Sequence, residues 1–169
     1  MTITGSLDGS DLVLRRTVPT SRARIWRYLA EPDRLAAWYG TYDGDPATGV
    51  VEVTMTAEPG EPATSPFAIH ACEPERLLTV SSSVGEQVWK LSIELEGGSD
   101  GAGGAAGDVT HLALRHHDLP ADMLEHVGPG WDWYLDRLVG AVTGMGVPGM
   151  DVWDAQYMSR APEYAALGR

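Results

Sequence analysis

The segment from residue 89 to residue 96 alternates between apolar and polar side chains. Trp89, Leu91, Ile93 and Leu95 would share one face of a strand, with polar side chains on the other face. A period of two is typical of an antiparallel strand that has one face in water and the other on a core. A fold built on this segment must therefore cover one face of a sheet.

Five further stretches have the composition of strands and end at turn residues. These five stretches are residues 12–18, 49–56, 66–72, 76–83 and 108–117, and residues 87–96 are the sixth predicted strand. The connections after residue 49 are short, which favours antiparallel pairing of successive strands. Because twisted sheets curl, we expect a curved six-stranded antiparallel sheet.

Two short helices are expected between the first and second strands. Thr20 or Ser21 can cap a helix that runs to about residue 30, and Pro32 is well placed to begin a second helix that ends before Gly40.

The longest predicted helix spans about residues 130–143, where Trp131, Leu135 and Leu138 mark an apolar stripe. The segment 128–130 is Gly-Pro-Gly, which we expect to interrupt any helix before it. An apolar sheet face needs a cover, and this helix can supply it. The expected fold is therefore α+β, a helix-grip in which the sheet and long helix enclose a cavity.

We expect a single domain over residues 1–169, with a core of about 11–145 and an extension, 146–169, packed on the body. A net charge of -12 argues against nucleic acid as a partner. Charges, Gly or Pro interrupt every apolar run, so membrane insertion is not expected. The single cysteine, Cys72, and an N-terminal stretch unlike a signal peptide favour the cytoplasm.

The order of elements resembles the START-like superfamily, and particular residues resemble the family named after the activator of the heat-shock protein 90 ATPase. These residues cover about 11–145 and are Arg16, Ile25-Trp26, Pro32-Asp33, Trp38-Tyr39, Pro74, Arg76-Leu77, Gly130-Trp131 and Leu135 to Leu138. The resemblance implies a helix-grip fold and the ability to dock on a chaperone.

The expected function is binding of a small hydrophobic or aromatic molecule between sheet and helix, without a cofactor. The candidate lining residues are Trp38, Met55, Phe67, Ile69, Trp89, Leu91, Leu112, Leu114, His116, Trp131 and Leu135.

A polyketide cyclase-like enzyme is the alternative, with His116 as the proton-transfer group and Arg16 as the partner of an enolate or carboxylate. Counting from Leu112 and Leu114, His116 points inward, where it could also be a wall residue or orient a ligand. Arg16 needs a carboxylate partner or an anionic ligand. The sequence shows no Ser-His-Asp order.

No metal site is expected, because the spacing of the five histidines does not bring them together. The glycine-rich segment 97–107 contains Gly-x-Gly-x-x-Ala, but it connects two strands and so cannot bind a dinucleotide as that motif does; we expect a floppy hairpin loop.

A second alternative is that the protein docks on a chaperone or forms a homodimer. Either contact would use Trp133 and Trp153 if these side chains are exposed. Against it, Trp133 could instead pack beside Arg137, four residues along a helix.

Overall fold

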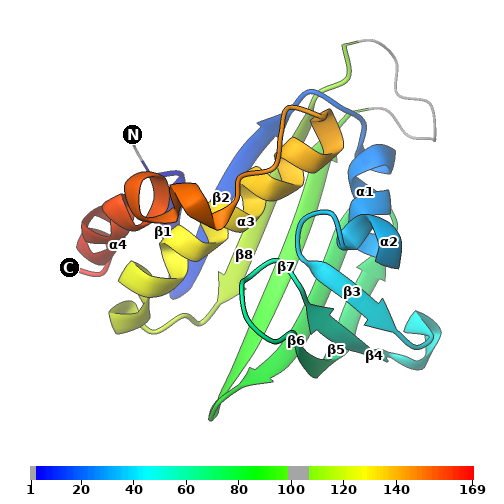
Figure 1. The fold of residues 1–169 in the computed structure, drawn as a ribbon, viewed down its shortest axis with the longest axis horizontal. Coiled ribbons are helices and arrows are strands. Elements are labelled where there is room, and N and C mark those ends of the chain that lie inside the picture. The colour runs from blue at the N-terminus through cyan, green and yellow to red at the C-terminus, as the bar shows by residue number, and fades with distance from the viewer. Residues whose placement is uncertain (1–2, 99–106) are drawn as a thin grey trace.

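The computed structural model describes residues 3–98 and 107–169, and its centre is one antiparallel sheet in the order β1-β2-β8-β7-β6-β5-β4-β3 (Figure 1). The glycine-rich loop predicted between residues 97 and 107 lies largely outside the described residues. The strands are β1 (Gly5–Asp8), β2 (Asp11–Val18), β3 (Gly40–Asp43), β4 (Val50–Met55), β5 (Ala63–Glu73), β6 (Leu77–Val84), β7 (Gln87–Gly97) and β8 (Thr110–His117). The helices are α1 (Arg22–Ala30), α2 (Pro32–Leu35), α3 (Leu124–Thr143) and α4 (Ala161–Leu167).

The prediction of six strands is wrong, because the sheet has 8 strands. The additional strands, β1 and β3, are 4 residues long and each begins with glycine and ends with aspartate, residues that weaken a strand pattern. Each lies at an edge of the sheet and pairs with a longer neighbour, β2 or β4. Pairing with that neighbour, rather than intrinsic propensity, holds them in place.

Helix α3 begins at Leu124, so the prediction that Gly128-Pro129-Gly130 interrupts a preceding helix is also wrong. A proline inside a helix removes one backbone hydrogen bond, a cost of about 3 kcal/mol. Burial of the large side chains on α3, Trp131, Trp133 and Leu135 among them, offsets that cost.

The long helix lies across the sheet, as Figure 1 shows, and β2 is the strand on which it packs most closely. Leu135 and Leu138 are almost completely buried in the same core cluster as Leu12 of β2 and Ile93 of β7. Helix α3 therefore covers the β2-β8-β7 part of the apolar face, and α1 and α2 lie over another part of it.

A buried charge network fastens the two ends of the chain to α3. The carboxylate of Asp132 is fully buried and accepts hydrogen bonds from Thr4, Arg16 and Tyr164, and it pairs with Arg160 at 3.1 Å. The segment before β1, strand β2 and helix α4 therefore meet at one carboxylate.

Among the described residues, no helix combines the length and the apolar character that crossing a membrane would require.

Candidate ligand-binding site

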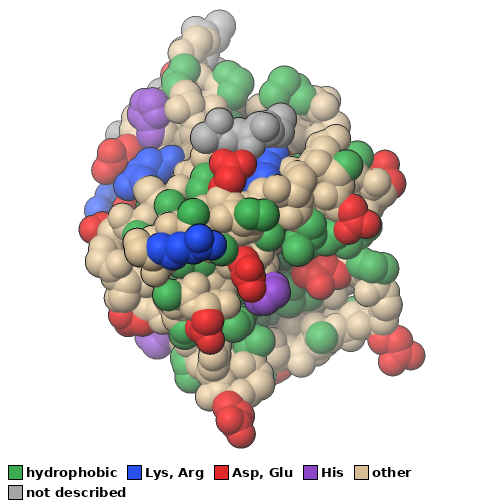
Figure 2. Space-filling view, turned by 90° about the vertical axis from the view of Figure 1, so that its left-hand side faces the viewer, with side chains coloured by type: hydrophobic (Ala, Val, Ile, Leu, Met, Phe, Trp, Pro, Cys, Tyr) green, Lys and Arg blue, Asp and Glu red, His purple; other side chains and the backbone are tan. Residues whose placement is uncertain are grey.

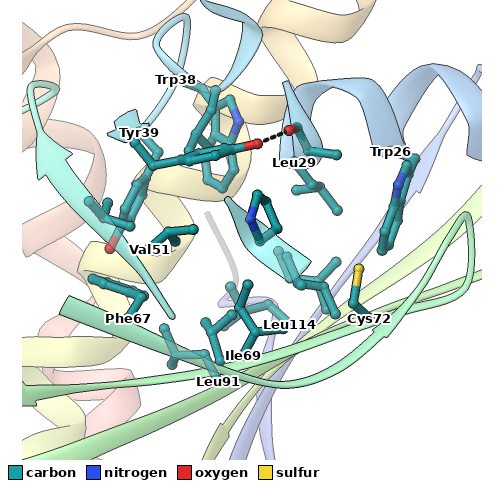
Figure 3. Close-up of a pocket in the computed structure, with 18 of the residues that line it drawn as sticks. Trp26, Leu29, Trp38, Tyr39, Val51, Phe67, Ile69, Cys72, Leu91 and Leu114 are labelled. Carbon is teal, nitrogen blue, oxygen red and sulfur yellow. Dashed lines mark hydrogen bonds between the residues drawn. The ribbon is translucent and has the colours of Figure 1, made fainter. Parts of the chain in front are cut away.

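The first pocket, which we call the apolar pocket, has a volume of about 160 Å³ and lies between helices α1 and α2 and the sheet (Figure 3). Trp26 and Leu29 of α1 lie on one side, and Ile69 and Leu91 of the sheet lie on the other. The alternation of strands β5 and β7 directs these sheet side chains toward the helices.

Two polar groups beside the apolar pocket, those of Trp38 and Tyr42, already have partners in the protein. The indole N-H of Trp38 donates to the carbonyl of Tyr28 at 2.9 Å, and the Tyr42 hydroxyl donates to the carbonyl of Ala30 at 2.5 Å. A molecule in this pocket would therefore meet mainly carbon.

The second pocket, which we call the aromatic pocket, has a volume of about 540 Å³ and lies between α3, the β6-β7 hairpin and the loop after β4. Figure 2 shows a face of the molecule that is hollowed between hydrophobic and acidic side chains. The aromatic residues that line this pocket are Tyr39, Phe67, Trp89, Trp131, Trp133, Tyr134 and Trp153. Its polar lining residues include Glu58, Ser65, Ser82 and His126.

The two pockets adjoin, because Tyr39, Phe67, Leu91 and Trp131 line both of them. We call these four residues the shared wall. Both pockets are partly open to solvent, so the predicted enclosed cavity is not what the structure contains. The helix covers the sheet without sealing the space beside it.

Most of the residues predicted to contact a ligand line one or both pockets. These are Trp38, Met55, Phe67, Ile69, Trp89, Leu91, Leu114 and Trp131. Leu112 and Leu135 instead lie in the close-packed core, and His116 lines neither pocket.

His116 points inward but is covered by two tryptophans. Its side chain is 2% exposed, its Nδ1 accepts a hydrogen bond from the indole N-H of Trp131 at 3.1 Å, and its ring centroid lies 4.8 Å from that of Trp89. Burial, assisted by the neighbouring His117, lowers the pKa of His116 to about 4. At neutral pH it is therefore an uncharged wall residue behind the indole rings.

This buried histidine should make stability depend on pH. Because the pKa of His116 falls from 6.5 in the unfolded chain to about 4 in the folded protein, acid protonates the unfolded state first. The contribution of His116 to the free energy of unfolding is constant above pH 6.5. It is lost as pH falls toward 4, and the free energy of unfolding drops by about 2–3 kcal/mol. Urea unfolding at pH 7.5 and pH 4.5 measures the loss.

His116→Gln is the matched variant, because the amide oxygen can still accept from Trp131 but does not titrate. We expect its loss of stability between the two pH values to be smaller than that of the wild type by the same 2–3 kcal/mol. Equal losses in the two proteins would contradict a buried neutral His116.

Arg16, the other candidate for chemistry, is held in the Asp132 network. Its guanidinium group donates to Asp132 at 2.9 Å and to Asp136 at 3.0 Å, and its side chain is 12% exposed. These carboxylates raise the pKa of Arg16 although burial opposes them. Arg16 lines neither pocket, so its partners are carboxylates of α3 rather than a ligand.

A Ser-His-Asp constellation that the sequence order does not reveal forms on the outer face of the sheet. Ser92 Oγ lies 2.8 Å from His117 Nε2, and His117 Nδ1 lies 3.3 Å from a carboxylate oxygen of Asp11. Ser92 is only 4% exposed and lies in the middle of a strand paired on both sides, so its backbone N-H cannot stabilise an oxyanion. We interpret the constellation as a structural hydrogen-bond chain, which continues to Thr79 at 2.8 Å.

The site also contains residues that sequence reasoning missed. Tyr134 lies one helical turn from Trp131, so the α3 stripe could have indicated it. Tyr39 follows the predicted Trp38, but Glu58 lies on the loop after β4, where no pattern marks it.

Trp133 is not available for partner docking as the sequence suggested, because it is only 1% exposed. The guanidinium carbon of Arg137 lies 4.7 Å from the centre of the Trp133 ring, and Trp153 packs on the same ring at 6.0 Å. The arginine four residues along α3 and the C-terminal tail therefore cover it. Within residues 3–98 and 107–169, no cluster of three or more potential metal ligands is found.

Solved structures with the same fold come from several bacteria. The crystal structure of CalU16 from Micromonospora echinospora is 25% identical, with a TM-score of 0.69 over 94% of this chain and 88% of that chain. The solution structure of the protein encoded by gene BPP1335 from Bordetella parapertussis is 24% identical, with a TM-score of 0.71 over 96% and 92%. DynU16, a protein of the dynemicin biosynthetic locus, is 17% identical, with a TM-score of 0.61 over 83% and 49%.

A comparison with curated proteins found no match. The family model described as activator of Hsp90 ATPase homolog 1-like protein matches residues 19–143, which include α1, α2, all of α3 and the strands from β3 to β8. These elements supply the shared wall and most of both pockets. The chain therefore belongs to the family of activator of Hsp90 ATPase homolog 1-like proteins, which have a START-like fold.

Proposed function

We propose that the protein binds a small hydrophobic or aromatic molecule against the shared wall, with part of it in the apolar pocket. The observation that supports this most is the volume of about 160 Å³, which is lined mainly by apolar side chains and beside which the polar groups of Trp38 and Tyr42 are already hydrogen-bonded. One water molecule needs about 10–15 Å³ by a comparable measure, so the space suits a molecule of several heavy atoms.

Energetics favour an occupant for such a space. Water that enters this partly open pocket finds few hydrogen-bond partners on its apolar walls, and it loses less when an apolar molecule replaces it. An apolar molecule that fills the pocket recovers the lost contacts and leaves water. The family match is consistent with this role, because the START-like fold places a concave sheet opposite a long helix.

Catalysis is not part of this proposal. The two groups that a cyclase-like reaction would use are not in contact with either pocket, since His116 lies behind Trp131 and Arg16 is bound to Asp132. Docking to a chaperone has no favouring contact either, because Trp133 is buried.

Filling the apolar pocket should weaken binding without unfolding the protein. Ile69 lines the pocket and is only half-buried, so Ile69→Trp would occupy the space with the larger side chain. We expect the dissociation constant of a neutral aromatic probe, 1-aminoanthracene, to rise at least about tenfold, which corresponds to the loss of roughly 1.4 kcal/mol of contact. Probe fluorescence during titration measures binding.

His70→Trp is the control, because His70 is the next residue of β5, is exposed and lines neither pocket. It adds the same indole to the protein but should bind the probe like the wild type. Urea unfolding of both variants verifies that they are folded. If Ile69→Trp binds the probe with wild-type affinity, the molecule does not occupy this pocket and the proposal is wrong.

A further inference from the structure

The charged group that lines the aromatic pocket is acidic. Its lining contains one carboxylate, Glu58, and among the described residues that line it there is no lysine or arginine. The only other ionisable side chain besides the tyrosines is His126, which is exposed and lies 3.4 Å from Glu125. An anionic ligand group would therefore meet a negative charge here, since Arg137, which stacks on the Trp133 ring, does not line the pocket and donates to the carbonyls of Trp38 and Pro148.

Glu58 lies beside an aromatic surface. Its Oε1 accepts a hydrogen bond of 2.7 Å from the hydroxyl of Tyr134. The ring of Tyr134 lies 5.1 Å from that of Tyr39 and 5.8 Å from that of Trp131, both of which belong to the shared wall. A carboxylate thus adjoins three aromatic rings that continue to the apolar pocket.

Aromatic faces and a nearby carboxylate are a combination that attracts organic cations. The negative face of an aromatic ring attracts ammonium groups, and the carboxylate of Glu58, although it is exposed, adds a Coulombic attraction at close range. The net charge of -12 would also raise the local concentration of cations over anions at the protein surface. On the face in Figure 2, acidic side chains border the hollow together with hydrophobic ones.

We propose that the aromatic pocket selects ligands that carry a protonated amine or a quaternary ammonium group. The cation would lie between Glu58 and the rings of Tyr134 and Trp131, while the apolar body of the ligand packs on the shared wall and extends into the apolar pocket. This inference rests on the proposed function, because it assigns a charge class to the molecule bound at the same site.

Three probes with the same ring system test the charge class. They are 1-naphthylmethylamine, 1-naphthylmethanol and 1-naphthoate, which are cationic, neutral and anionic at pH 7.5. Each is titrated as a competitor of bound 1-aminoanthracene. We expect the amine to bind about tenfold more tightly than the alcohol, and the carboxylate to bind more weakly than both.

Glu58→Gln removes the charge and keeps an acceptor for the Tyr134 hydroxyl. We expect this variant to bind the amine no more than about twofold more tightly than the alcohol. Glu61→Gln is the control, because Glu61 is exposed on the same loop, does not line the pocket, and changes the net charge of the protein by the same amount. It should keep the wild-type preference for the amine.

Two results would overturn the inference, and they differ in what they say about the site. If the amine and the alcohol compete equally well, or if Glu61→Gln weakens the preference as much as Glu58→Gln does, the pocket has no cation site but the proposed binding function stands. If wild-type and Ile69→Trp proteins bind 1-aminoanthracene alike and no naphthyl probe competes, the proposed function fails together with the inference.

Discussion

Replacing Asp132 with alanine should lower the free energy of unfolding by about 3–5 kcal/mol, because it leaves buried positive charge without its central carboxylate. Asp132 is 0% exposed, and two guanidinium groups, those of Arg16 and Arg160, lie within 3.1 Å of its oxygens. The hydroxyls of Thr4 and Tyr164 lose their acceptor as well. Urea unfolding followed by circular dichroism near pH 7 measures the change.

Asp136→Ala provides the comparison, since Asp136 also binds Arg16 but is 34% exposed. Water can replace part of what this carboxylate provides to Arg16 and to the hydroxyl of Tyr157, so we expect a smaller loss, of about 1–2 kcal/mol. An Asp132→Ala protein as stable as Asp136→Ala would show that the buried network contributes little beyond an ordinary surface ion pair.

Adding one methyl group at Gly128 should cost about 1–3 kcal/mol, while the same change at Gly130 should not destabilise the protein. A Cβ at Gly128 would lie 2.3 Å from Cδ1 of Tyr164, whose ring is fully buried and whose hydroxyl is fixed by Asp132. A Cβ at Gly130 would meet nothing within 4 Å. Because alanine is a better helix former than glycine, Gly130→Ala should gain up to about 1 kcal/mol.

Chemical unfolding of the two alanine variants gives the comparison in one experiment, and limited proteolysis adds a second readout. If Tyr164 is displaced in Gly128→Ala, helix α4 should detach and the tail should be cleaved faster than in the wild type. Equal stability of the two variants would mean that α4 is not packed on α3 through this contact.

The sequence predicted those parts of the fold that repeat with a regular period. The alternation in β7 and β8 correctly indicates the inward faces, including that of His116, because side-chain direction follows from local geometry alone. Strands β1 and β3 were missed because short segments gain their structure from the neighbours they pair with. The start of α3 was missed because the cost of Pro129 is offset by tertiary burial.

In the candidate site, too, only the residues that follow a regular period were predictable from the sequence. A period places Trp89, Leu91 and Trp131 on inward faces, and all of them line a pocket. The periodic pattern does not reveal which inward-facing residues are covered by side chains of another element. For this reason His116 was expected to face a ligand, whereas in the structure Trp131 lies in front of it. Glu58 could not be anticipated, because loop residues reach a pocket through tertiary contacts that leave no periodic pattern.

The arrangement around Asp132 also determines the order in which the protein can mature during synthesis. A ribosome makes Thr4 and Arg16 before their carboxylate partner, which follows 128 and 116 residues later, and Tyr164 comes 32 residues after Asp132. Strand β2 likewise cannot pair with β8 until that strand has left the exit tunnel. The nascent chain must therefore keep one edge of β2 unpaired until β8 emerges, a period in which chaperones that hold unfolded chains can bind it.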